Sequence, residues 1–167
     1  MRGEHTANTM PGSGMIVLFN EASPQDAHVS DHPKEHQLEG QRTPRCILIV
    51  EDDTSLANLE AGVLSAHGFL VTIASNGEQA IATLHQSIPD LVVLDLELST
   101  TLSGWDVLDV LRPSTRIPVI LATSSETDVR KYRHIRGETK FTLDYLPKPY
   151  PMQTLLKRVK RMLMIVP

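Results

Sequence analysis

Five short apolar runs alternate with stretches of helical periodicity from residue 46 onward, and this alternation most constrains the fold. Short Ile/Val/Leu runs separated by helical segments predict βαβ units and a parallel sheet that is buried on both faces. The predicted strands are 46–50, 69–74, 91–95, 118–122 and 143–146. The predicted helices are 54–67, 78–87, 105–112, 126–136 and 151–164, with Asn76-Gly77 as a turn.

Polar residues follow four of the five apolar runs. They are Glu51-Asp52-Asp53, Asp95, Thr123-Ser124 and Lys148-Pro149. Because the carboxyl ends of parallel strands meet at one edge of an open sheet, we expect these side chains to converge in one crevice. Carboxylates, a hydroxyl and a lysine together suit an Mg²⁺-assisted transfer of a phosphoryl group onto a carboxylate.

Each of these residues also has a simpler explanation when it is taken alone. The acids at 51–53 suit a helix N-terminus, and Thr123 or Ser124 suits a helix cap. Asp95 suits a turn, and Lys148 suits an exposed surface. Three adjacent acids after a buried strand nevertheless repel one another, and a divalent cation relieves that repulsion. The occurrence of all four groups at strand ends favours a shared site.

Charge divides the chain into two unequal parts. Residues 46–111 contain ten acids and no Lys or Arg, whereas residues 112–167 contain twelve Lys or Arg and four acids. Either the two parts neutralise each other within one domain, or the last two helices form a basic docking face. No stacking aromatic residues interleave with the basic ones, which argues against direct nucleic-acid binding.

The remaining composition predicts a cytoplasmic protein with no membrane partner. No apolar run reaches the roughly 18–20 residues of a membrane span, and the run 15–19 is too short for a signal peptide. Cys46 is the only cysteine, so an internal disulfide is excluded, and its place in an apolar run predicts a buried, inert thiol. Residues 1–45 lack a sustained period and predict a flexible, disordered tail before a domain at 46–165.

The motifs of this domain resemble a known family. The stretches ILIVEDD, PDLVVLDLEL, GWDVL, IPVILATSS and DYLPKPY occur in the order found in the receiver domain of bacterial two-component response regulators. The resemblance covers residues 46–165. It implies a flavodoxin-like, doubly wound, five-stranded parallel sheet of order 2-1-3-4-5 with five helices.

The resemblance also implies a role for individual residues. Asp95 matches the phosphoacceptor, and Lys148 matches the lysine that pairs with phosphoryl oxygen. Glu51, Asp52 and Asp95, with the backbone carbonyl of Glu97, match the Mg²⁺ ligands. A receiver of this kind catalyses only its own phosphotransfer and autodephosphorylation, and is not otherwise an enzyme.

The family's switch and its partners follow in the same way. Thr123 matches the hydroxyl that moves toward the phosphoryl group, Tyr145 matches the aromatic residue that then turns inward, and the bond before Pro149 is usually cis. The implied partners are a histidine kinase or histidine phosphotransfer protein and a downstream protein target. The implied signalling face comprises the strands and helices between 118 and 164, of which 126–164 could also form a homodimer.

The chain departs from the family pattern at five places. Ser99 replaces a usual proline, Ser124 replaces a common alanine, and Glu97 brings a carboxylate near the phosphoryl position. The loop 98–104 and the segment 137–143 are longer than usual. These departures change the loops around the site and remove none of its chemical groups.

Three functions are compatible with this pattern. The first is a stand-alone single-domain response regulator, because the sequence stops after the last predicted helix. The second is a degenerate receiver that binds a partner without phosphorylation. The third is a phosphatase of the haloacid-dehalogenase type, which Asp95-Leu96-Glu97 resembles faintly, although that family requires an Asp at position 97.

Overall fold

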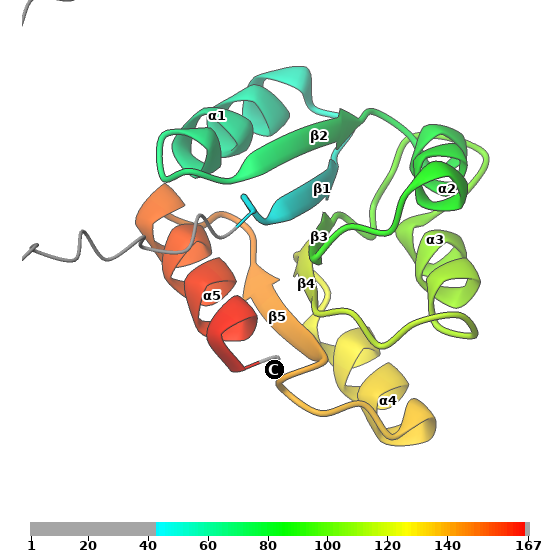
Figure 1. Ribbon diagram of the computed structural model, residues 1–167. Helices are drawn as coiled ribbons and strands as arrows, with labels where there is room; N and C mark the ends of the chain where they lie inside the picture. The colour runs from blue at the N-terminus through cyan, green and yellow to red at the C-terminus, as the bar shows by residue number, and fades with distance from the viewer. Residues whose placement is uncertain (1–42, 166–167) are drawn as a thin grey trace, which may run out of the picture. The chain divides into compact units, whose positions relative to one another are not determined.

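The computed structural model describes residues 43–165 and contains a parallel sheet of order β2-β1-β3-β4-β5 (Figure 1). The strands are β1 (Cys46–Val50), β2 (Leu70–Ala74), β3 (Leu91–Leu94), β4 (Val119–Thr123) and β5 (Leu143–Pro147). The helices are α1 (Thr54–Ser65), α2 (Gly77–Gln86), α3 (Gly104–Leu111), α4 (Glu126–Arg136) and α5 (Met152–Ile165). The predicted doubly wound fold is therefore confirmed.

Alternate residues of each central strand point to opposite faces of the sheet, so the chain builds two cores. Leu48 and Val50 pack with α2, α3 and α4, whereas Ile47 and Ile49 pack with α1 and α5. Figure 1 shows the same division, with α1 and α5 on one side of the sheet and the other three helices opposite. All four of these strand side chains are buried, as a sheet covered on both faces requires.

Helix caps explain two polar residues near the strand ends. Asp53 is the N-cap of α1, and its Oδ1 accepts hydrogen bonds from the backbone N–H groups of Ser55 (2.8 Å) and Leu56 (3.1 Å). Asn76 caps α2 in the same way, so the predicted turn at Asn76-Gly77 is the start of that helix. Most other element ends differ from the sequence prediction by one or two residues.

The prediction of a buried Cys46 thiol is wrong. Cys46 is exposed, because it is the first residue of β1 and the covering helices bury the strand only from Ile47 onward. Its backbone N–H donates to Asp90 Oδ2 at 2.7 Å, which fixes the beginning of the strand.

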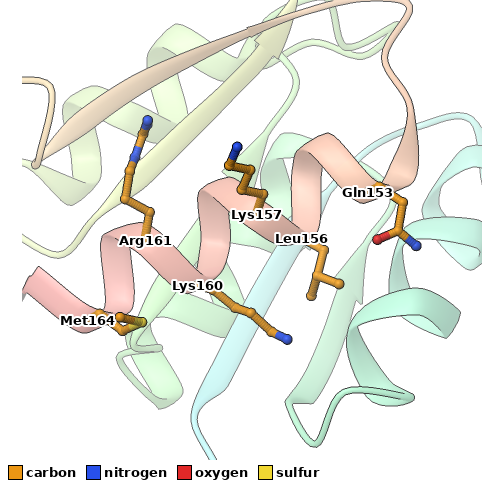
Figure 2. A pocket seen from close by; sticks show the side chains of 6 residues that line it. All are labelled: Gln153, Leu156, Lys157, Lys160, Arg161 and Met164. Atoms are coloured by element: carbon orange, nitrogen blue, oxygen red, sulfur yellow. The ribbon is translucent and has the colours of Figure 1, made fainter.

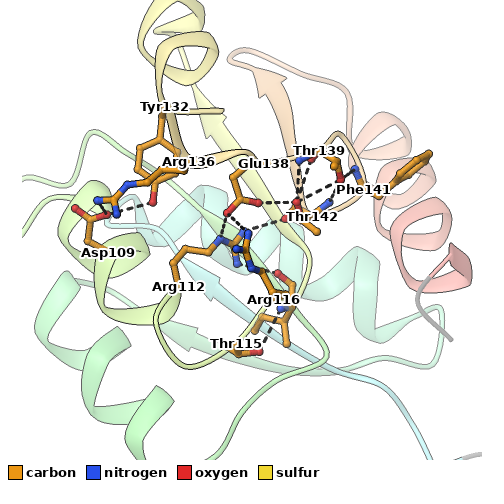
Figure 3. Close-up of polar contacts among 11 residues, drawn as sticks. Asp109, Arg112, Thr115, Arg116, Tyr132, Arg136, Glu138, Thr139, Phe141 and Thr142 are labelled. Atoms are coloured by element: carbon orange, nitrogen blue, oxygen red, sulfur yellow. Dashed lines mark hydrogen bonds and ion pairs between the residues drawn. The ribbon is translucent and has the colours of Figure 1, made fainter. Parts of the chain in front are cut away.

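The long segment 137–143 is anchored by a buried ion pair (Figure 3). Arg112 Nε lies 2.6 Å from Glu138 Oε1, and the two side chains are 7% and 1% exposed. Arg112 also donates to the backbone carbonyls of Ile117 (3.0 Å) and Thr142 (2.9 Å). The extra residues between α4 and β5 are therefore an ordered connection held by the end of α3.

Two further sequence predictions concern membrane-spanning segments and the N-terminal residues. Within residues 43–165, no helix is long and apolar enough to cross a membrane. The predicted tail at residues 1–45 lies almost wholly outside the described residues.

Glu138→Leu should lower the free energy of unfolding by about 3–5 kcal/mol, because it leaves the Arg112 charge buried without its counter-ion. The double variant Arg112→Met/Glu138→Leu should lose less, because neither charge remains. Chemical denaturation measures both effects. Arg116→Met is the matched control, since that guanidinium is 68% exposed and 3.7 Å from Glu138, and it should cost under ~1 kcal/mol. Equal small losses for Glu138→Leu and Arg116→Met would contradict the role of the buried pair.

Candidate phosphoacceptor site

The carboxyl ends of three strands bring two acids and a lysine into direct contact. Glu51 follows β1, Asp95 follows β3 and Lys148 follows β5. Lys148 Nζ donates to Glu51 Oε2 at 2.7 Å and to Asp95 Oδ2 at 2.6 Å. Residues that are up to 97 positions apart in the sequence therefore form one charged cluster, as the strand-end pattern predicts.

Burial and charge work against each other within this cluster. Glu51 is 3% and Asp95 4% exposed. Burial raises the pKa of Glu51, and the hydrogen bond and charge of Lys148 partly offset that rise. Burial also lowers the pKa of Lys148, but the hydrogen bonds to Asp95 and Glu51 outweigh it and leave the pKa raised. Lys148 therefore stays positively charged between the two acids.

Asp52 stands at the mouth of the cluster and is held by the long loop after Asp95. Its Oδ2 accepts hydrogen bonds from the Ser99 backbone N–H (2.9 Å) and from the Ser99 hydroxyl. The hydroxyl bond is the main reason that the pKa of Asp52 is lowered. Ser99, which replaces a proline of the family pattern, thus supplies two donors that a proline lacks.

Three carboxylates are close enough to share a cation. One carboxylate oxygen each from Glu51, Asp52 and Asp95 lies within 4.8 Å of the other two. A hard cation that takes oxygen ligands, such as Mg²⁺, suits this donor set. Asp53 stays outside the group, because its side chain caps α1. Glu97 contributes a backbone N–H that donates to Asp95 Oδ1 at 2.9 Å.

The end of β4 places two hydroxyls beside the cluster. Thr123 is fully buried, its Oγ1 accepts the Ser125 N–H (3.3 Å), and its carbonyl accepts the Lys148 N–H (3.2 Å). Ser124 Oγ donates to Glu97 Oε1 at 2.7 Å, so the exposed Glu97 carboxylate is bonded to the loop after β4.

Tyr145 in β5 is half-buried against the core that faces α2, α3 and α4. The adjoining turn contains a cis bond between Lys148 and Pro149, as the family resemblance implies.

Sequence reasoning missed two features of the site. The first residue of α3, Gly104, lies against the end of β3, where an added Cβ would stand 2.1 Å from the Asp95 carbonyl oxygen. Only glycine permits this approach, and the GWDVL motif carried the signal. The second is the buried Glu60 of α1, which accepts a hydrogen bond from Tyr150, two residues after Lys148. A lone acid inside a helical pattern gave no sign of this contact.

Comparison with known proteins gives the family. The family model of the response regulator receiver domain matches residues 47–160. The chain belongs to this family. It is 37% identical over 117 residues to the sensory transduction protein RegX3 of Mycolicibacterium smegmatis, a match that spans 70% of this chain and 50% of that protein. It is 35% identical over 114 residues to the DNA-binding response regulator MtrA of Mycolicibacterium paratuberculosis, which spans 68% of this chain and 49% of that protein. The chain thus spans about half the length of these relatives.

Solved receivers share the fold. The signal receiver domain of a LuxO repressor protein from Vibrio parahaemolyticus aligns with a TM-score of 0.63 at 30% identity, over 73% of this chain and 92% of that domain. The chemotaxis protein CheY4 of Vibrio cholerae aligns with a TM-score of 0.63 at 22% identity, over 72% and 99%, and supports the fold alone.

Mg²⁺ should bind this receiver in the millimolar range, because waters complete the coordination of a cation held by few carboxylates. Asp52→Ala should weaken that binding at least several-fold, as measured by isothermal titration calorimetry. Asp53→Asn is the matched control, since Asp53 caps α1 and should leave Mg²⁺ affinity unchanged. Equal affinities of Asp52→Ala and the wild type would exclude Asp52 from the ligand set.

Proposed function

We propose that this receiver accepts a phosphoryl group on Asp95 from a histidine kinase or a histidine phosphotransfer protein. The observation that carries the proposal is the buried Asp95 carboxylate, held by Lys148 and flanked by two further acids. In the transfer, one Asp95 oxygen forms a bond to phosphorus while the bond from phosphorus to the donor histidine nitrogen breaks. Asp95 is then a mixed anhydride, and the donor imidazole recovers a proton.

Each residue around Asp95 has a part in this step. Lys148 neutralises negative charge on the phosphoryl oxygens and holds the group in line with the attacking carboxylate. Glu51, Asp52 and Asp95, with the backbone carbonyl of Glu97, would hold Mg²⁺, which supplies further neutralisation of charge when bound. The intact set favours a phosphoaccepting receiver over a degenerate one.

The phosphoryl group would be sensed at the end of β4. It adds roughly −1.5 to −2 charges, which the Thr123 hydroxyl can answer with a hydrogen bond. Within residues 43–165, the Thr123 hydroxyl accepts only a long bond from Ser125, so its movement toward the phosphoryl group costs little. Tyr145 is half-buried on the next strand and would turn inward as Thr123 moves. Signalling then proceeds as a population shift of the face formed by β4, α4, β5 and α5.

The outer surface of α5 supports an acidic protein as a downstream partner. A shallow hollow of about 660 Å³ lies along this helix (Figure 2), and it is lined by Gln153, Leu156, Lys157, Lys160, Arg161 and Met164. The exposed basic side chains and the 83% exposed Met164 offer both charge and an apolar contact. A second copy of the chain, docked through α4, β5 and α5, is a further partner that we propose, whereas direct nucleic-acid binding is not part of the proposal.

Acetyl phosphate with Mg²⁺ should add one phosphoryl group to the wild-type chain, and Asp95→Asn should abolish the addition, because an amide cannot form the acyl phosphate. Intact-mass spectrometry measures the adduct. Asp53→Asn should label like the wild type. Full labelling of Asp95→Asn would refute the assignment, and an unlabelled wild type would favour a degenerate receiver.

Glu97→Gln should accelerate labelling several-fold at low salt, because it removes a negative charge near the path of the anionic donor. At the short distance that we expect between Glu97 and the phosphoryl donor, one unit charge is worth about 1 kcal/mol after screening. The lifetime of the adduct should change as well. Ser124→Ala is the matched control, since it removes the hydrogen bond to Glu97 and keeps the charge, so its labelling rate should stay near that of the wild type. Identical rates for Glu97→Gln and the wild type would mean that the Glu97 carboxylate faces solvent and does not affect phosphorylation.

A further inference from the structure

Glu60 is an ionisable residue whose side chain is fully buried in the domain. It lies in α1 with 0% exposure, beside the apolar core shared by α1 and α5. Its Oε1 accepts a hydrogen bond from the Tyr150 hydroxyl, and its Oε2 has no hydrogen-bond partner among residues 43–165. A buried carboxyl oxygen without a partner costs stability, and an apolar residue of the same size avoids that cost. Stability alone therefore does not account for Glu60.

The position of Tyr150 connects Glu60 to the site. Tyr150 follows Lys148 and Pro149 in the turn between β5 and α5. At one end of this turn, the Lys148 N–H donates to the Thr123 carbonyl at 3.2 Å. At the other end, the Tyr150 hydroxyl is bonded to Glu60. The turn that carries the Lys148 side chain is thus held from both sides, once by β4 and once by α1.

We propose that Glu60 is a positioning residue that, through the Tyr150 hydroxyl, fixes the turn carrying Lys148 and so holds the Lys148 ammonium between Glu51 and Asp95. Glu60 touches none of the reacting groups itself. The proposal rests on the proposed function of Asp95 as the phosphoacceptor.

The charge of Glu60 adds a pH dependence that is separate from the hold on the turn. Burial raises the pKa of Glu60 to about 7, against the opposing effect of the Tyr150 hydrogen bond. Glu51 and Asp95 disfavour its ionised form, and Lys148 favours it. Below pH 7 the neutral carboxyl accepts the Tyr150 bond without adding charge. Above pH 7 its negative charge competes for Lys148 and repels an anionic phosphoryl donor, so labelling should slow as pH rises.

Two variants separate positioning from structure. Glu60→Met removes the orphaned oxygen and should raise the melting temperature at pH 8, whereas Tyr150→Phe leaves Glu60 without any partner and should lower it. Both variants release the turn, so both should slow acetyl-phosphate labelling at pH 6 several-fold. A purely structural Glu60 predicts instead that labelling follows stability, and a labelling rate of Glu60→Met at or above that of the wild type would overturn the proposal.

Glu60→Gln and a distant control complete the test. Glu60→Gln keeps an acceptor for Tyr150 and cannot ionise, so its labelling rate should stay flat between pH 6 and 8 while that of the wild type falls several-fold. Tyr132→Phe removes a hydroxyl that bonds Asp109 on the other side of the sheet, and its labelling should match the wild type. The same pH dependence in Glu60→Gln and in the wild type would contradict the effect that we assign to the Glu60 charge.

The positioning role of Glu60 can also be measured without any phosphorylation. The NMR signal of the Lys148 ammonium reports its surroundings without any phosphorylation. We expect this signal to shift in Glu60→Met and Tyr150→Phe and to stay unchanged in Tyr132→Phe. An unlabelled wild type with these shifts would refute the phosphoacceptor role and keep the positioning role. Unchanged signals in both variants would refute the positioning role, whatever the labelling shows.

Discussion

The bridge from Lys148 to Glu51 and Asp95 is the interaction on which the rest of the site depends. Two nearly buried acids a few ångströms apart repel each other strongly in a medium of low dielectric constant. One ammonium at 2.6–2.7 Å from both makes this arrangement tolerable. The parallel order β2-β1-β3-β4-β5 places the three strand ends where this bridge can form. The sheet therefore brings the two acids together, and the positive charge of Lys148 offsets the repulsion between them.

Close packing and hydrogen bonds also hold the residues around the bridge in place. Gly104 lets α3 start against the end of β3, which leaves the Asp95 backbone in place. Ser99 holds Asp52 at the mouth of the site, and Ser124 holds Glu97. Tyr150 also ties the turn that carries Lys148 to α1. Two of the residues that depart from the family pattern, Ser99 and Ser124, are thus bonded to acids close to Asp95.

The strands and the convergence of the acids with Lys148 could be predicted from the residues, because short apolar runs, helical periodicity and strand-end chemistry are local signals. The sheet order followed from the family resemblance and not from these patterns. The exposure of Cys46 could not be predicted, since the pattern does not say how far a covering helix extends over the first residue of a strand. The pairing of Arg112 with Glu138 joins the end of α3 to a loop after α4. The bond from Tyr150 to Glu60 spans 90 residues. Contacts of this kind depend on packing between distant segments, which periodicity does not encode.

The role of Asp95 as phosphoacceptor, with Lys148 as its counter-ion, is tested most directly by a crystal structure with Mg²⁺ and beryllofluoride, which mimics a phosphoryl group on a carboxylate. We expect beryllium bonded to an Asp95 carboxylate oxygen. We also expect Lys148 Nζ to leave its position between Glu51 and Asp95 and contact a fluorine atom, with Mg²⁺ held by Asp52 and its acidic neighbours. Beryllofluoride bound elsewhere, or Lys148 still paired with both acids while Asp95 carries the adduct, would contradict these roles.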